Sequence, residues 1–345
     1  MSSKLEHKAA YECSARGFLH RQLCEHPPRH ALTGQPLSGQ TVIVTGSNVG
    51  LGYESSRQLL QLGVSKLIMA VRSKAKGDAA AAQLRDEMSK ASIICTIDVW
   101  VLDMASYASI KAFVARCDAE LTRIDIVLLN AGFRATEFQR HAESGHEMGL
   151  QVNYFGTALL SALLAPILKS KKTALPAGVA PRLCCVASDT AYMAKVDYDK
   201  PLVEQVDDEK AFATLTCYPK TKLMILMFMT ELAKRVAADD VLISCTNPGL
   251  TRGTSFNSGS GNPVVDFIGG GAMRLLARSV EVGASTYINS VVVQGKESHG
   301  SFTSDWTIKP YPTALYTAQG QRASRDLWQS TIHELGVGSI ETFSI

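Results

Sequence analysis

The chain has little excess of charge of either sign. Its 345 residues include 35 lysines and arginines and 32 acids, which leaves a net charge of +3 near neutral pH. Nucleic acids and anionic membranes attract clustered basic residues, and no such cluster stands out in this sequence. The composition therefore argues against a nucleic-acid partner.

Long hydrophobic runs are also missing. The longest apolar stretches are residues 154–168, which small and polar residues interrupt, and residues 223–229. Both are shorter than the roughly 18–20 residues that a membrane-spanning helix requires. The first six residues are polar and lack the apolar segment of a secretory signal. We therefore expect a cytoplasmic protein without a membrane span.

The chain contains eight cysteines, but no two of them have the C-x-x-C spacing. Several lie in apolar runs such as residues 183–186, which is typical of buried, reduced thiols in a cytosolic protein. The histidines near the N-terminus match no ligand pattern, so we expect no metal site. They are His7, His20, His26 and His30.

From residue 40 onwards, short apolar strands alternate with helical segments. Strands are predicted at 41–44, 66–71, 94–101, 125–129, 182–187, 241–246 and 301–303. Helices are predicted at 52–62, 74–90, 106–121, 144–169, 218–236 and 279–293. Continuous β-branched runs between helices indicate parallel strands buried on both faces. The predicted fold class is α/β, a doubly wound, Rossmann-like parallel sheet of about seven strands with helices on both faces.

The domain organisation follows from where this rhythm starts and where it breaks. Residues 1–39 are expected to form an N-terminal extension with some helix in 5–25, and residues 40–345 a single Rossmann-like domain. Within it, the acid-rich residues 189–217 read as an insertion, and the glycine-rich residues 252–275 as a candidate substrate lid. Ordinary surface loops are the alternative for both segments.

A glycine-rich turn separates the first predicted strand from the first predicted helix. Gly46, Gly50 and Gly52 have the spacing G-x-x-x-G-x-G. Glycine permits positive φ and lets backbone N–H groups approach a phosphate closely, and the helix N-terminus adds its dipole. The turn therefore predicts a pyrophosphate site, although its spacing differs from the common G-x-G-x-x-G. The turn is completed by Ser47, Asn48, Val49 and Leu51.

Tyr218 and Lys222 are four residues apart, so both side chains emerge from one helix face. Hydride transfer between a carbinol carbon and a nicotinamide leaves a proton to be moved, and Tyr218 is the candidate acid or base. One cation about 4–5 Å away supplies roughly the energy needed to lower a tyrosine pKa by about 2–3 units. We therefore predict that Lys222 lowers the pKa of Tyr218. Pro219 is tolerated in a helix's first turn, so Tyr218 is expected near the helix start.

These motifs, in this order, resemble the short-chain dehydrogenase/reductase family over roughly residues 38–305. The N-terminal extension and residues 41–50 also resemble fungal members associated with secondary-metabolite pathways, and the chain is similar to retinol-dehydrogenase-like members. The matching positions are residues 45–52, Asp103, Asn130-Ala131-Gly132, Asn153, Ser188, residues 218–222 and Pro248-Gly249.

The resemblance implies a catalytic tetrad of Tyr218, Lys222, Ser188 and Asn153. Ser188 follows a strand end, where its hydroxyl would bind and polarise the substrate oxygen. Asn153 would bend a helix and hold a water in a proton relay through Lys222, which would also hold the nicotinamide ribose.

The resemblance also implies cofactor contacts. Asp103 and Met104 would lie near the adenine, and residues 130–132 (Asn130, Ala131 and Gly132) would support the sheet and the ribose. Pro248 and Gly249 would meet the nicotinamide. The family's usual threonine position is occupied here by Gly253, so either Thr251 or Thr254 could take that role; Thr251 is preferred.

The end of the second predicted strand indicates NADP(H) as the cofactor. An acid there would bind a ribose 2′-hydroxyl and favour NAD, but the strand is followed by Arg72 and Ser73. A guanidinium and a hydroxyl suit a 2′-phosphate, and Lys74 or Lys76 could assist.

The predicted function is an NADP-dependent oxidoreductase that interconverts a ketone or aldehyde and an alcohol on an apolar small molecule, expected to be a secondary metabolite. An apolar substrate is expected because no charged cluster lies near the predicted cleft, and Tyr192, Met193 and Phe256 are candidate pocket residues. Imine or enone reduction, or isomerisation or cyclisation on the same scaffold, is the alternative. A non-enzymatic NADP-sensing protein is a second alternative.

The predicted helices at 154–168 and 223–229 are apolar on nearly all sides. One face of each should pack on the sheet, and the other needs cover. The resemblance implies a homodimer with a four-helix interface. The N-terminal extension or the tail after Tyr311 could cover this face instead and leave a monomer.

Overall fold

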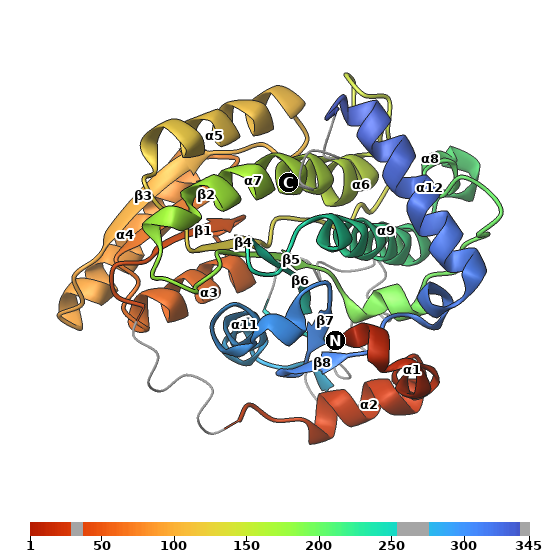
Figure 1. Cartoon of the computed structure of the whole chain (residues 1–345), viewed down its shortest axis with the longest axis horizontal. Helices are drawn as coiled ribbons and strands as arrows, with labels where there is room; N and C mark the ends of the chain where they lie inside the picture. The colour runs from red at the N-terminus through yellow and green to blue at the C-terminus, as the bar shows by residue number, and fades with distance from the viewer. Residues whose placement is uncertain (29–36, 254–275, 339–345) are drawn as a thin grey trace.

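A single sheet forms the centre of the computed structural model, which describes residues 1–28, 37–253 and 276–338 (Figure 1). The strand order is β3-β2-β1-β4-β5-β6-β7-β8. The strands are β1 (Thr41–Thr45), β2 (Lys66–Val71), β3 (Thr96–Val101), β4 (Ile126–Leu129), β5 (Arg182–Val186), β6 (Leu242–Asn247), β7 (Phe302–Ser304) and β8 (Thr307–Lys309). The order changes direction between β1 and β4, which opens a crevice at the carboxyl ends of these strands.

All neighbouring strands pair in parallel except β7 and β8, which are antiparallel. The fold class is confirmed, with eight strands among the described residues rather than about seven. The extra strand β8 is only three residues long and follows a two-residue turn at Asp305 and Trp306, both with positive φ. Such turns usually contain Asn or Gly, so this hairpin left no recognisable signal in the sequence.

Helices cover both faces of the sheet (Figure 1). One face carries α3 (Gly50–Gln61), α4 (Lys74–Lys90) and α11 (Val280–Ile288), and the other carries α5 (Tyr107–Glu120), α7 (Thr157–Lys171) and α9 (Thr214–Arg235). Each layer buries its own apolar cluster against the strands, as a sheet with two hydrophobic faces requires.

Further helices and turns complete the described chain. The remaining helices are α1 (Glu6–Glu12), α2 (Ala15–Cys24), α6 (Met148–Leu150), α8 (Glu204–Asp207) and α12 (Ala318–Leu335). The 3₁₀ turns are η1 (Ser2–Lys4), η3 (Lys172–Ala174), η4 (Asp189–Met193), η5 (Glu209–Ala211), η8 (Lys296–Ser298) and η9 (Thr313–Tyr316). Two π-helical turns, η2 (Gln151–Gly156) and η7 (Asn289–Val293), precede α7 and follow α11.

The start of α9 differs from the prediction. The helix begins at Thr214, so Tyr218 is not at its start and Pro219 lies in its second turn rather than its first. Proline has no N–H to donate to the carbonyl four residues back, here that of Leu215. The helix nevertheless continues through Pro219 because the buried face that follows packs on the sheet.

The predicted helix at 144–169 is three consecutive elements, α6, η2 and α7. The stretch Met148–Ala174 is long and apolar enough to cross a membrane by length and composition, and it is longer than the apolar run seen in the sequence. However, 78% of its most apolar window is buried inside the protein. It is therefore a core helix of the α/β domain.

Helix α12 covers the outer face of α9 (Figure 1). Leu327, Trp328 and Leu335 of α12 are buried and belong to the same apolar cluster as α7 and α9. Of the two covers considered from the sequence, it is the tail after Tyr311 that lies on α9.

The N-terminal helices α1 and α2 lie beside β7 and β8 (Figure 1). Ser2 joins them to this edge of the sheet: its hydroxyl donates to the Lys309 carbonyl at 2.5 Å and accepts from the Phe302 N–H at 2.9 Å. Residues 189–217 contain η4, α8, η5 and the start of α9. The lid predicted at 252–275 lies outside the described residues apart from its first two positions.

All eight cysteines are free thiols. Five of them are buried, whereas Cys13 and Cys95 are half-buried and Cys24 is exposed. The eight free thiols match the expectation of reduced cysteines. The expectation of burial does not hold for Cys13, Cys24 and Cys95.

Candidate active site

The structure brings Tyr218 of α9 next to Ser188, which follows β5. Ser188 is the N-cap residue of η4, and its hydroxyl accepts a hydrogen bond from the Thr190 N–H at 3.2 Å. Burial raises the pKa of Tyr218, and a hydrogen bond with Ser188 partly offsets this rise. The two hydroxyls therefore share one site at the carboxyl end of the sheet, where substrates of such folds bind.

Lys222 lies beside Tyr218 but is not the group that sets its pKa. The Lys222 ammonium is 5.7 Å from the centre of the Tyr218 ring, and it donates to the Val186 carbonyl at 2.8 Å. The prediction that Lys222 lowers the pKa of Tyr218 is wrong for this structure, because burial of the phenol outweighs every favourable charge and the pKa is raised. Burial likewise lowers the pKa of Lys222.

Asn153 lies in the π-helical turn η2 and bridges two segments. Its Oδ1 accepts from the Phe133 N–H at 2.9 Å, and its Nδ2 donates to the Phe133 carbonyl at 2.8 Å. A Cβ on Gly132 would stand 3.1 Å from Asn153 Oδ1 and 3.6 Å from Lys222 Nζ. The absence of a side chain on Gly132 thus leaves room for both Asn153 and Lys222 beside its backbone. Such π-turns are frequent at functional sites.

A small pocket opens beside Tyr218, and its wall contains residues that the sequence did not single out. Phe133, Ala135, Phe212 and Cys217 form the apolar part of this wall, which also contains Glu147, Gly149, Asn153, Thr214, Tyr218 and Thr221. Phe133 directly follows the Asn130-Ala131-Gly132 motif, so its position was a usable signal. Phe212 lies in the insertion, where no local pattern pointed to it.

The pocket residues predicted from the sequence lie elsewhere. The Tyr192 hydroxyl donates to the Pro310 carbonyl at 2.7 Å and its ring packs edge-on against Phe302, so it is not part of the pocket wall. Met193 is 70% exposed and also lies outside that wall. Phe256 is outside the described residues. Arg134 was also missed, and its positive charge lies near enough to act on the Tyr218 pKa.

The glycine-rich turn has the geometry that a phosphate cradle needs. Gly46 and Gly50 have φ of 65° and 58°, and a Cβ on Gly52 would stand 2.4 Å from the Gly46 carbonyl oxygen. Helix α3 begins at Gly50 without a side-chain cap, whereas α4 and α5 are capped by serines. The buried hydroxyl of Ser47 has no hydrogen-bond partner among the described residues. These uncapped donors fit a dinucleotide pyrophosphate.

Neighbouring strands hold this turn in place. Asn130 donates its side-chain amide to the Thr45 and Gly46 carbonyls at 3.0 and 3.2 Å. The Ala131 N–H donates to the Thr45 hydroxyl at 2.9 Å. Residues that follow β4 thus hold the glycine-rich turn in place, in addition to the contacts within the turn itself.

The end of β2 places Arg72 on the surface. Arg72 is exposed and makes no ion pair with any described residue, whereas Lys74 is paired with Asp78 at 2.6 Å. Ser73 caps α4 by accepting from the Lys76 N–H at 3.4 Å. Arg72 is therefore available to an anion at this strand end, and so is the exposed Lys76, which makes no ion pair with any described residue.

The other predicted cofactor residues follow the carboxyl ends of β3 and β6. The Asp103 carboxylate accepts a hydrogen bond from the Ala105 N–H at 3.0 Å. The Met104 carbonyl oxygen packs closely on Gly156, since a Cβ on Gly156 would stand only 2.0 Å from it. Thr251 is 5% exposed, and its hydroxyl lies 2.7 Å from the Cβ position of Gly283 on α11. The Cβ position of Gly283 is also 2.9 Å from Leu51 Cδ2, so Thr251 lies near the glycine-rich turn; Thr254 is outside the described residues.

Comparison with known proteins identifies the family. A profile described as short chain dehydrogenase matches residues 40–176. The short chain dehydrogenase virL of Hypocrea virens is 49% identical over 335 residues, which span 97% of this chain and 96% of that protein. The chain belongs to the short-chain dehydrogenase family. The short chain dehydrogenase/reductase mfmJ of Annulohypoxylon moriforme is 40% identical over 321 residues, 91% of this chain and 89% of that protein.

Solved structures of short-chain dehydrogenases share the fold. L-sorbose reductase from Gluconobacter frateurii, complexed with NADPH and L-sorbose, matches 78% of this chain and 96% of its own, with a TM-score of 0.58 and 18% identity. A short-chain dehydrogenase from Sphingobium yanoikuyae, in complex with NADPH, matches 85% of this chain and 95% of its own, with a TM-score of 0.54 and 18% identity. At this identity the likeness concerns the fold.

Proposed function

We propose that this short-chain dehydrogenase is an NADP(H)-dependent oxidoreductase that interconverts a ketone or aldehyde and an alcohol. The observation that carries the proposal is the hydrogen-bonded pair of Tyr218 and Ser188 at the carboxyl end of the sheet, with Lys222 beside it. NADPH, when bound, supplies the hydride. The uncapped start of α3 and the free guanidinium of Arg72 fit its phosphates.

The raised pKa of Tyr218 suits the reductive direction. A phenol that keeps its proton at neutral pH acts as the acid that protonates the carbonyl oxygen as hydride reaches the carbonyl carbon. Ser188 donates to the same oxygen and orients it. Lys222 and Asn153 hold the surrounding backbone at Val186 and Phe133, and a proton would return to Tyr218 along this side of the site.

The pocket wall supports an apolar substrate. Phe133, Phe212 and Cys217 offer apolar contact within the same cavity as Tyr218. We propose a secondary metabolite with an aromatic or alicyclic ketone. We further propose that residues 40–345 form one domain, with residues 1–39 as its extension, and that the protein acts in the cytoplasm.

The test is turnover of NADPH with acetophenone, 9,10-phenanthrenequinone and cyclohexenone, followed by NADPH absorbance and product analysis. We expect alcohol products, and a loss of at least about a hundredfold in kcat for Tyr218→Phe with NADPH binding retained. Tyr192→Phe is the matched control, because its hydroxyl donates to a backbone carbonyl away from the pocket. Saturated ketone from cyclohexenone, with no alcohol from any substrate, would instead favour enone reduction. NADPH binding without any turnover, and a Tyr218→Phe variant with unchanged biological activity, would favour a sensor.

A further inference from the structure

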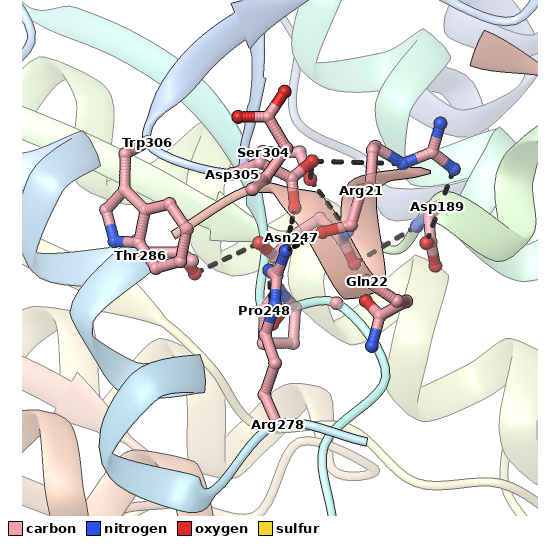
Figure 2. A network of polar contacts seen from close by, with 12 residues as sticks. Arg21, Gln22, Asp189, Asn247, Pro248, Arg278, Thr286, Ser304, Asp305 and Trp306 are labelled. Carbon is pink, nitrogen blue, oxygen red and sulfur yellow. Dashed lines mark hydrogen bonds and ion pairs between the residues drawn. The ribbon is translucent and has the colours of Figure 1, made fainter. Parts of the chain in front are cut away.

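Two adjacent residues of the N-terminal helix α2, Arg21 and Gln22, face the loops that follow β5 and β6 (Figure 2). Both are buried, with 3% and 8% of their surface exposed. They come from a segment outside the strand–helix alternation, yet they lie at the carboxyl end of the sheet, where the proposed reaction would take place. A role for them in that reaction rests on the proposed function.

Arg21 connects the extension to the residue next to Ser188. Its guanidinium donates to the Glu12 carboxylate at 2.5 Å and lies 3.7 Å from the Asp189 carboxylate. The Asp189 N–H in turn donates to the Asn247 side chain at 3.1 Å. Asp189 is therefore held from α2 on one side and from β6 on the other, and Ser188 is the residue immediately before it.

Gln22 holds the loop that follows β6. Its Oε1 accepts from the Leu250 N–H at 3.1 Å, and its Nε2 donates to the Leu250 and Leu276 carbonyls at 3.1 and 2.9 Å. It thus pairs with the backbone as a neighbouring strand would. Gly249 has a φ of 72°, and a Cβ there would stand 2.6 Å from Gln22 Oε1. The loop and Gln22 are therefore closely fitted to each other.

Arg278 connects helix α2 to the loop after β6 and to the β7–β8 turn (Figure 2). Its guanidinium donates to the Arg21 carbonyl at 2.6 Å, to Asp305 at 2.5 Å and to the Pro248 carbonyl at 3.4 Å. Asp305 is 2% exposed and also lies 3.8 Å from the Arg21 guanidinium. Helix α2, the loop after β6 and the β7–β8 turn thus share one buried set of charges.

A buried network of this kind is a costly way to attach a helix. Burying paired charges loses much of their hydration energy, and apolar residues of similar volume often stabilise as well or better. Directional charged contacts, in contrast, fix the position of the groups they join. The network is built on the two loops that border the site, which is where such positioning has a chemical use.

We propose that Arg21 and Gln22 are positioning residues for the reaction of this short-chain dehydrogenase. Arg21 fixes Ser188 through Asp189, and Gln22 fixes the Pro248-Gly249-Leu250 loop on the nicotinamide side of the crevice. Helix α2 is then part of the active-site framework, and substitutions of Arg21 and Gln22 change catalysis and cofactor affinity separately.

The test uses full-length Arg21→Met and Gln22→Met, which keep approximate volume and remove the polar contacts. For Arg21→Met we expect a kcat about tenfold to a hundredfold lower at saturating NADPH and ketone, with the Kd for NADPH nearly unchanged. For Gln22→Met we expect the Kd for NADPH, measured by nucleotide fluorescence without ketone, to rise at least about fivefold. Arg21→Lys should restore part of kcat, because lysine keeps the positive charge but lacks the several N–H donors of the guanidinium.

Ser2→Ala is the matched control, since Ser2 attaches the same extension to β7 and β8 through hydrogen bonds to Phe302 and Lys309, and not to the loops after β5 and β6. It should lower the Tm and leave kcat and the NADPH Kd unchanged. If Arg21→Met does not fold, Asp189→Asn removes the same ion pair from the other side and should lower kcat as well. The inference is overturned if these variants lower only the Tm, as Ser2→Ala does.

Failure of the inference and failure of the proposed function are distinguishable. If the wild-type chain reduces ketones, Tyr218→Phe does not, and Arg21→Met and Gln22→Met behave as the wild type, the inference alone is wrong. If the wild-type chain reduces none of them, the proposed function is wrong. The NADPH affinity of Gln22→Met still decides the cofactor half of the inference in that case.

Discussion

The indole ring of Trp328 stacks on the phenyl ring of Phe228, with the ring centres 4.8 Å apart and the planes 25° apart. The Arg235 guanidinium lies 4.3 Å from the centre of the same indole, and the Tyr154 hydroxyl is hydrogen-bonded to Thr331 at 2.6 Å. Helix α12 thereby covers part of the outer face of α9, one of the two helices considered for a dimer interface.

We predict that Trp328→Ala lowers the free energy of unfolding by about 3–5 kcal/mol, the usual cost of deleting a buried aromatic side chain. Trp328 is 6% exposed, so the substitution leaves a cavity above Phe228. Urea denaturation measures the change, and Trp328→Phe is the control that should lose much less. A loss below about 1 kcal/mol for the alanine variant would show that α12 is only loosely attached.

The same contact bears on the oligomeric state. Sedimentation at micromolar concentration should give a monomer for the wild-type chain, whereas Trp328→Ala should self-associate because it uncovers apolar surface on α9. A wild-type dimer that Trp328→Ala leaves unchanged would mean that another surface mediates assembly.

We expect His146 to make the stability of the C-terminal helix depend on pH. Its ring nitrogens lie 2.6 Å from Asp207 and 2.5 Å from Glu334 of α12. Burial alone would lower the pKa of His146, but the bonds to Asp207 and Glu334 more than offset it and raise the pKa to about 9. A raised pKa stabilises the fold fully below the unfolded value of about 6.5, and this stabilisation is lost as pH rises through about 9.

We therefore predict that the stability difference between the wild type and His146→Gln is larger at pH 6 than at pH 10. The full shift would correspond to about 3 kcal/mol, but solvent screening of the partly exposed Glu334 reduces our expectation to about 1–2 kcal/mol. Denaturation curves at the two pH values give the difference. An equal difference at both would show that His146 does not carry this charge.

Substitution of Gly52 should weaken cofactor binding. In Gly52→Ala the new methyl group would stand 2.4 Å from the Gly46 carbonyl oxygen and 2.5 Å from Asn130 Nδ2, so the turn must open. We expect at least about a tenfold rise in the Kd for NADPH by fluorescence titration. Gly338→Ala is the control, since nothing lies within 4 Å of its Cβ position. Unchanged affinity in Gly52→Ala would place the cofactor elsewhere.

Arg72 should determine the choice between NADPH and NADH. Arg72→Asp replaces a guanidinium at the end of β2 with an acid, which repels a 2′-phosphate and binds a ribose 2′-hydroxyl. We expect the ratio of the two affinities to shift towards NADH by about a hundredfold or more. Lys74→Gln, which removes a cation already paired with Asp78, should change it little. A ratio unchanged by Arg72→Asp would exclude Arg72 as the discriminating residue.

The predictions that held depend on local patterns. Apolar runs placed the seven parallel strands to within about two residues, and helix α4 has the predicted bounds, because side-chain periodicity reports directly which faces are buried. The glycine spacing located a turn with positive φ at Gly46 and Gly50, because this property belongs to the residue itself. The order of the motifs pointed to the family before any contact was known.

Local patterns in the chain were therefore enough to predict the parallel part of the sheet, the crevice at its strand ends and the family. The raised pKa of Tyr218, the cover that α12 places on α9 and the link from Arg21 to Asp189 became visible only in the folded molecule. Each of these depends on which groups surround a side chain after folding. Burial and electrostatic interactions depend on distances in space, and the groups that come close to one another here lie far apart in the chain. A local sequence pattern therefore cannot show them.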